Sequence, residues 1–94
     1  MALARVVSFD GVDSGRMAEL SREVQEGDRP EGLPATEMII LHDPEGAQAL
    51  AIVFFENEAD YAQGDATLNA MSGGDTPGRR TSVQKYQVAV RATA

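Results

Sequence analysis

The chain has 94 residues, no cysteine, and a formal net charge of −7 from 15 acidic and 8 basic residues. That length makes one domain, residues 1–94, whose core buries only about 60–65% of the surface exposed on unfolding, and the absent cysteines exclude disulfides and thiolate metal sites as a supplement. The scattered basic residues argue against nucleic acid and anionic membranes as partners, and the amino-terminal residues resemble neither a signal peptide nor a membrane span, so we expect a cytoplasmic protein.

A strand and then a helix are expected in the first third of the chain. Residues 4–10 have strand composition, and Asp13 or Ser14 can cap a helix that follows the break at residues 11–12. Over residues 16–25 the apolar positions are three or four apart, which predicts one narrow apolar stripe on a helix. The stripe consists of Met17, Leu20 and Val24.

A hairpin is expected over residues 38–55. Asp43, Pro44 and Gly46 occupy the positions that a type I turn favours, and a left-handed Gly46 would give a three-residue loop in which Asp43 faces Ala47. One face of the hairpin would then carry Met38, Ile40, His42, Leu50, Ile52 and Phe54. The other face would carry Ile39, Leu41, Ala49, Ala51, Val53 and Phe55. Both faces are apolar.

A second helix and a last strand complete the chain. Asn57 is the expected cap of the helix, and Gly64 predicts a bend, with Asp65 capping a restarted segment. The core candidates on this helix are Ala59, Ala62, Leu68 and Met71. Residues 79–94 are expected to form a strand, with Tyr86, Val88 and Val90 on one side and Lys85, Gln87 and Arg91 on the other.

The element order β-α-β-β-α-β predicts an α+β, ferredoxin-like antiparallel sheet with two helices on one face. Two helices cover only one face of four strands, yet the central hairpin is apolar on both. A contiguous exposed apolar face is typical of an association site, and a second copy of the chain around a two-fold axis is the simplest cover. We therefore expect a homodimer.

With this element order, the apolar strand at residues 51–55, the helix entry at residues 56–61 and the tyrosine-bearing last strand at residues 81–90, the chain resembles the dimeric α+β-barrel superfamily. That group includes the antibiotic-biosynthesis monooxygenases, and the resemblance covers nearly the whole chain. It implies a barrel formed by two subunits and a cavity between the helices and the sheet of each. Haem-degrading members have a histidine on the second helix and a cavity tryptophan; this chain has neither, so the resemblance implies no haem, and we expect no cofactor.

His42 and Tyr86 are the candidate catalytic residues, and Tyr61, Phe54 and Met38 are the candidate ligand-binding residues. His42 is the only histidine and can act as a general base, although a rim histidine bonded to backbone or solvent is the commoner case. Tyr86 can orient a carbonyl or a phenol, although a core tyrosine is commoner. No metal site is expected, since turn and cap chemistry explain the acidic residues near His42 and Asn57.

Arg5 and Arg91 can bind an anionic ligand, pair with Glu37, or extend along the sheet margin, which we prefer.

Two functions remain open on the sequence. The first is a cofactor-independent enzyme, monooxygenase-like or isomerase-like, that acts on a small apolar or aromatic metabolite. The second is a non-catalytic homodimer that binds a small molecule or has a purely structural role. A fold of this kind supports both.

Overall fold

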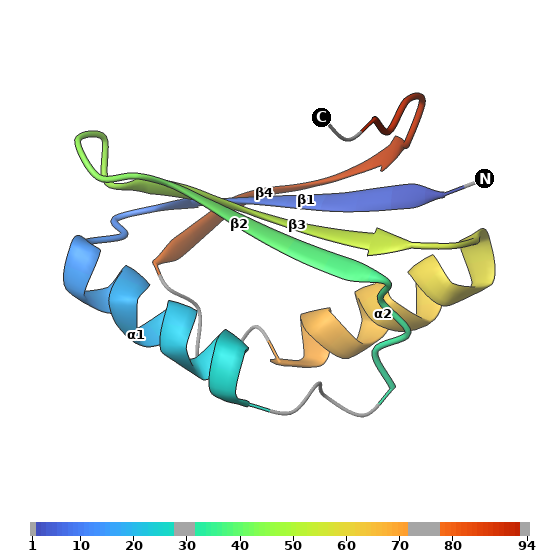
Figure 1. Ribbon diagram of the computed structural model, residues 1–94, viewed down its shortest axis with the longest axis horizontal. Coiled ribbons are helices and arrows are strands. Elements are labelled where there is room, and N and C mark those ends of the chain that lie inside the picture. Colours follow the sequence, from blue (N-terminus) through green and yellow to red (C-terminus); the bar gives the residue numbers. More distant parts are fainter. Residues whose placement is uncertain (1, 28–31, 72–77, 93–94) are drawn as a thin grey trace.

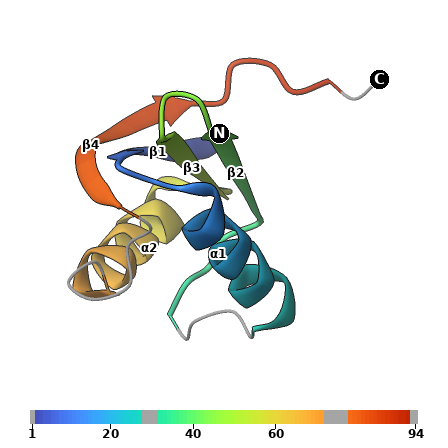
Figure 2. The same cartoon turned by 90° about the vertical axis from the view of Figure 1, so that its left-hand side faces the viewer.

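The computed structural model describes residues 2–27, 32–71 and 78–92. The elements follow the predicted order: β1 (Leu3–Asp10), α1 (Ser14–Glu26), β2 (Glu37–Asp43), β3 (Gln48–Phe55), α2 (Glu58–Met71) and β4 (Arg79–Gln87). All neighbouring strands are antiparallel in the order β2-β3-β1-β4, and both helices lie on one face of the sheet (Figures 1 and 2). The ferredoxin-like α+β fold is thereby confirmed. Within the described ranges, neither helix has the length and apolar content to cross a membrane.

Both helices begin at the polar side chains that the sequence indicates. The Asp13 carboxylate accepts a hydrogen bond from the Arg16 amide at 2.7 Å, and the Asn57 side-chain oxygen accepts one from the Asp60 amide at 2.8 Å. Each cap satisfies an amide that the first turn of a helix leaves without a partner.

The predicted interruption of the second helix is wrong, because α2 is continuous across Gly64. A Cβ atom at Gly64 would lie 2.2 Å from Cε1 of Phe55, so the glycine lets the Phe55 ring lie directly against the helix backbone. The glycine therefore serves packing, and no bend is needed to explain it.

The hairpin register differs from the prediction by one residue. Asp43 pairs with Gln48, so the loop comprises residues 44–47, and Ala47 rather than Gly46 is left-handed, with φ of 53°. Asp43 does organise the turn, since its carboxylate accepts hydrogen bonds from the Glu45 and Gly46 amides, each at 3.2 Å.

Because side chains alternate along a strand, this shift exchanges the faces that β2 and β3 share. The predicted faces are therefore wrong. The helix side carries Met38, Ile40 and His42 with Ala49, Ala51, Val53 and Phe55; the other side carries Ile39 and Leu41 with Leu50, Ile52 and Phe54.

Two buried clusters fill the space between the sheet and the helices. One consists of Leu3, Leu33, Ala35, Val53, Phe55 and Tyr61, with Leu68 packed against it. The other consists of Val7, Phe9, Val12 and Ala49, with Met17 and Ala51 against it. Of the predicted core residues on α2, Leu68 is partly buried, whereas Ala59 and Ala62 are exposed, because Tyr61 and Gly64 take the inward positions. The side chain of Met71 lies outside the described part of the structure.

A polar seam, defined by Arg5, Glu58, Asp65, Asn69, Arg80 and Lys85, joins α2 to β1 and β4. Arg5 Nε donates to Asp65 Oδ1 at 2.8 Å and Arg5 Nη2 donates to Asn69 Oδ1 at 2.9 Å. Arg80 also donates to Asn69, and Lys85 binds Glu58. The predicted marginal position of Arg5 is wrong: the residue is 3% exposed, because Asp65 neutralises its guanidinium and Asn69 accepts a further hydrogen bond from it.

The sheet face opposite the helices, called the open face below, is largely apolar. The register places Ala4, Val6, Ile39, Leu41, Leu50, Ile52, Phe54 and Tyr86 on it. Leu41 and Tyr86 are each 50% exposed. The chain described here therefore leaves an apolar surface in water, as the sequence predicts.

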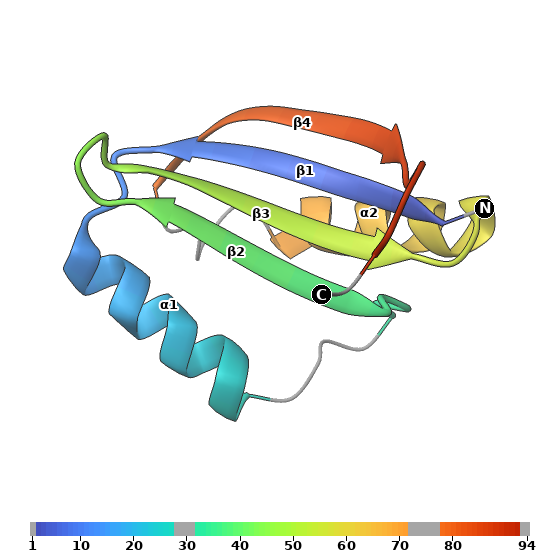
Figure 3. The same cartoon turned by 45° about the horizontal axis from the view of Figure 1, so that its top comes forward.

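The C-terminal arm, residues 88–92, follows β4 and crosses one end of the open face (Figure 3). The Val88 amide donates to the Ala2 carbonyl at 2.9 Å. Arg91 lies 3.8 Å from the Glu37 carboxylate, and its guanidinium is 4.5 Å from the centre of the Phe54 ring. The last strand thus ends at Gln87, earlier than predicted, and the preferred marginal position of Arg91 gives way to the pairing with Glu37.

Candidate functional site

An α1–β2 groove of about 380 Å³ lies on the helix side of the sheet. Its lining comprises Met17, Ser21, Val24 and Gln25 of α1 and Met38, Ile40 and His42 of β2. Met17 packs against the buried cluster around Phe9, whereas Val24, nearer the end of α1, is 44% exposed. The groove exists because α2 packs on β1 and β3, which leaves α1 alone beside the edge strand β2 (Figure 2).

His42 is the polar side chain of the groove for which the structure indicates which ring nitrogen carries the proton. Its Nε2 lies 3.0 Å from the carbonyl oxygen of Val12. A carbonyl oxygen only accepts, so Nε2 carries the proton and the neutral ring keeps a lone pair on Nδ1. Val12 is fully buried and directly precedes the cap of α1, so the bond also fixes the end of β2 to the start of that helix.

The hydrogen-bonding capacity of His42 is only half used. The ring is partly buried, and no buried side-chain nitrogen or oxygen in the described residues lacks a partner. Since Nδ1 has no partner among those residues, the atom is accessible from outside and available as an acceptor. The described lining holds no Asp, Glu, Lys or Arg, so His42 is the one titratable side chain in it.

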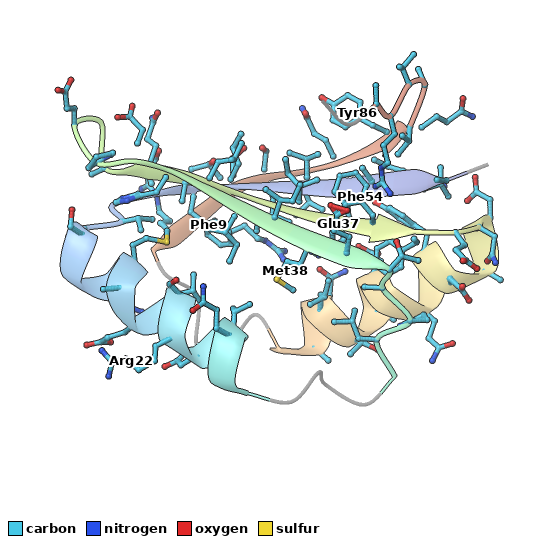
Figure 4. The ribbon with its side chains drawn as sticks, viewed as in Figure 1. Phe9, Arg22, Glu37, Met38, Phe54 and Tyr86 are labelled. Atoms are coloured by element: carbon cyan, nitrogen blue, oxygen red, sulfur yellow. The ribbon has the colours of Figure 1, made fainter. Side chains whose placement is uncertain are left out.

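The structure separates the predicted site residues into three places. Met38 and His42 lie together in the groove. Phe54 and Tyr86 lie on the open face, and Tyr86 donates its hydroxyl proton to Gln84 on its own strand. Tyr61, a residue of α2, lies in a buried cluster between that helix and the sheet. Figure 4 shows Met38 on the helix side of the sheet and Tyr86 on the opposite side, so the two candidate catalytic residues, on opposite faces and opposite edge strands, do not form one site.

The side chain of Tyr61 has a structural role in the core. Its ring meets the Phe55 ring edge-on at 5.4 Å between centres, and Lys85 Nζ lies 4.8 Å above it. Burial raises the pKa of Tyr61 above 10.0, and the nearby Asp65 carboxylate raises it further, although Arg5 and Lys85 act in the opposite direction. The phenol therefore stays protonated at neutral pH and packs away from the groove.

Sequence reasoning missed the α1 side of the site. The stripe of Met17 and Val24 was visible as helix periodicity, but the pattern does not say which strand the helix faces. In the described residues, no group of three or more His, Cys, Asp or Glu side chains is arranged to hold a metal ion.

The sequence matches no protein-family model, and no curated protein matches it.

Proposed function

We propose that the chain is a homodimeric small-molecule-binding protein of the dimeric α+β-barrel kind, which holds a small apolar or aromatic molecule in the α1–β2 groove. The observation that carries the proposal is the composition of the groove: four apolar side chains from two elements surround one histidine with a free acceptor. Ligand sites are mostly apolar concavities with a few polar groups that fix orientation, and their volumes begin at about 300 Å³.

The described lining holds no formally charged side chain, and this limits the ligand. A carboxylate or phosphate would lose its hydration without gaining a cationic partner there, which costs several kcal/mol. An uncharged ligand with a donor group for His42 Nδ1 fits the site.

The open face supports the dimer. Its apolar side chains belong to three adjacent strands and extend to Tyr86 on the fourth. Pairing two copies through the edge strand β2 is less favourable, because full antiparallel pairing of Glu37–Asp43 with itself puts each Glu37 opposite the acidic Asp43 of the partner. Packing face to face avoids this repulsion and buries the apolar surface.

Substitutions at Met38 and Ile39 test the groove and the dimer separately. They are neighbours on β2, 38% and 37% exposed, and point to opposite faces of the sheet. Met38→Glu should abolish binding in the groove and leave the dimer intact, whereas Ile39→Glu should produce monomers that still bind. 1-Naphthol is a suitable neutral probe, since the chain has no tryptophan to interfere with its fluorescence.

Binding is measured by fluorescence titration and subunit state by sedimentation velocity. Wild-type protein that leaves 1-naphthol unbound, or Met38→Glu protein that binds it equally well, would contradict the groove assignment. Wild-type protein that sediments as a monomer at micromolar concentration would contradict the dimer.

An enzyme is the second candidate, favoured by the free Nδ1 of His42. In this alternative, a cofactor-independent monooxygenase-like or isomerase-like enzyme, His42 takes a proton from a bound substrate without help from Tyr86. Exchange of an acidic C–H of a bound ligand with D2O, followed by NMR, tests it. Exchange that is equally fast with wild-type and His42→Ala protein would rule out this role.

A further inference from the structure

The two ends of the open face differ: one carries the C-terminal arm and the other a concavity. What we infer from them rests on the proposed dimer. At one end the C-terminal arm stands clear of the sheet (Figure 1). Its Val90 is 84% exposed, so a single subunit leaves this apolar side chain in water. Arg91, the only charged residue of the arm, makes its contact with Glu37 at 3.8 Å, with both side chains about half exposed. Arg91 also lies over the Phe54 ring, and the Val88 amide holds the start of the arm to Ala2, so beyond Val88 only these exposed Arg91 contacts attach the described arm to its own subunit.

At the other end, beside the β2–β3 hairpin, lies a hairpin-end concavity of about 400 Å³. Leu41 and Leu50 form an apolar part of its lining, and Asp10 and Asp43 bring two carboxylates to it. Asp10 accepts a hydrogen bond from Gln48 at 3.2 Å and lies 3.7 Å from the largely exposed Arg79. Asp43 binds the amides of its own turn. The lining of the concavity thus combines apolar side chains with carboxylates.

We propose that the C-terminal arm of each subunit lies in the hairpin-end concavity of the other subunit. The arm and the concavity are complementary in polarity and charge. Val90 can pack on Leu41 and Leu50, and Arg91 can pair with the carboxylates of Asp10 and Asp43. A two-fold axis that lies between the facing sheets, perpendicular to their strands, brings the arm end of one subunit over the hairpin end of its partner. Both contacts then form twice, as an isologous interface requires. Arg91 then leaves Glu37 and the Phe54 ring of its own chain and contacts two carboxylates of the partner.

The same contact cannot form within one subunit. The arm begins beside Ala2, whereas Asp10 is the last residue of β1. Eight residues of strand separate these positions, roughly 26 Å at about 3.3 Å per residue. Any energetic coupling between Arg91 and Asp10 therefore reports a contact between subunits.

A mixture of two charge-reversal variants tests this contact. Homodimers of Asp10→Lys place Arg91 against the introduced lysine twice, and homodimers of Arg91→Glu place the introduced glutamate against Asp10 twice. Both should dissociate roughly tenfold more readily than the wild type. In the heterodimer one contact is the original Arg–Asp pair and the other is the reversed Glu–Lys pair. Native mass spectrometry of an equimolar mixture should therefore show about nine-tenths heterodimer, where random association gives about half.

Arg22→Glu is the matched control. Arg22 is exposed on α1, directed away from the sheet (Figure 4), and its substitution changes the net charge by the same amount. A mixture of Asp10→Lys with Arg22→Glu offers no restored pair and should show no preference for the heterodimer. Val90→Asp gives a separate readout: it should weaken the wild-type dimer without changing the far-ultraviolet circular dichroism of the subunit.

Preferential heterodimers in the first mixture alone, with a weaker dimer for Val90→Asp, are the expected result. Heterodimer fractions that match in the two mixtures, or an unchanged dimer for Val90→Asp, would overturn the position of the arm while leaving the dimer proposal intact. A wild-type chain that is monomeric would overturn the dimer proposal and this inference with it.

Discussion

Gly64→Ala should destabilise the protein, although alanine is the better helix former. On propensity alone the substitution in α2 would stabilise the helix by about 1 kcal/mol. The new Cβ would, however, lie 2.2 Å from Cε1 and 2.4 Å from Cζ of Phe55, where carbon atoms normally lie about 3.5–4.0 Å apart. Phe55 is fully buried against Tyr61, so its ring can shift only by displacing neighbouring core side chains. Overpacking typically costs about 1–3 kcal/mol, and we expect a net loss of about 1–2 kcal/mol.

The control is the same substitution in a protein that already carries Phe55→Leu. Phe55→Leu removes the ring atoms that cause the clash, at a cost below the roughly 3–5 kcal/mol typical of Phe→Ala. In that background Gly64→Ala should stabilise the protein by roughly 0.5–1 kcal/mol, so the sign of its effect reverses. The assay is urea unfolding followed by circular dichroism at one fixed protein concentration, because dimerisation couples stability to concentration. Greater stability of Gly64→Ala in the wild-type background would refute the packing argument.

Three further predictions concern single contacts. Ala47→Gly should raise the free energy of unfolding by roughly 1 kcal/mol, because glycine adopts the left-handed conformation without a Cβ penalty; a loss in urea unfolding would contradict this. Asp65→Ala should lower the free energy of unfolding by about 2 kcal/mol, less than the loss of a fully buried pair because the Asp65 side chain is 36% exposed. In a double-mutant cycle, adding Arg5→Met should recover part of this loss. The raised pKa of Tyr61 means that the folded state holds the phenol proton more tightly than the unfolded state, so this contribution to stability is complete below pH 10 and is lost as pH rises through the folded pKa. Tyr61→Phe should therefore flatten the decline of the free energy of unfolding above pH 10. Equal slopes of that free energy against pH for both proteins would disprove the assignment.

The topology could be predicted from the sequence because its signals are local. The caps at Asp13 and Asn57 and the turn residue Asp43 act within three residues of their partners, and each forms the contact that its chemistry indicates. The spacing of the apolar residues then fixes the type of each element. These signals do not depend on which distant segments meet.

The register of the hairpin could not be predicted because its apolar pattern is symmetrical. When both faces of β2 and β3 are apolar, either register buries similar side chains, and the loop alone decides. Gly46 suggested the left-handed residue, but its role is spatial: a Cβ there would lie 2.7 Å from the Asp43 carboxylate. Ala47 takes the positive φ instead. This single residue determines that His42 faces α1 and enters the groove.

The burial of Arg5 lay beyond sequence reasoning for a different reason. Its partners Asp65 and Asn69 are 60 and 64 residues away, and a lone arginine in an apolar strand carries no sign of them. The position of Tyr86 illustrates the same limit. Its strand was expected, but its separation from His42 depends on the order of strands in the finished sheet.

The two helices are attached to the sheet by different forces, and temperature should distinguish them. Beside the sheet, α1 has Met17 against an apolar cluster, whereas α2 adds the directional contacts of the polar seam. Apolar association weakens on cooling, while hydrogen bonds and ion pairs do not depend on that driving force. Near freezing, the C-terminal end of α1 should therefore move away from β2 before α2 moves, while the hydrogen bond from His42 to Val12 keeps the start of α1 in place. The width of the α1–β2 groove would then respond to cold while the rest of the subunit stays in place.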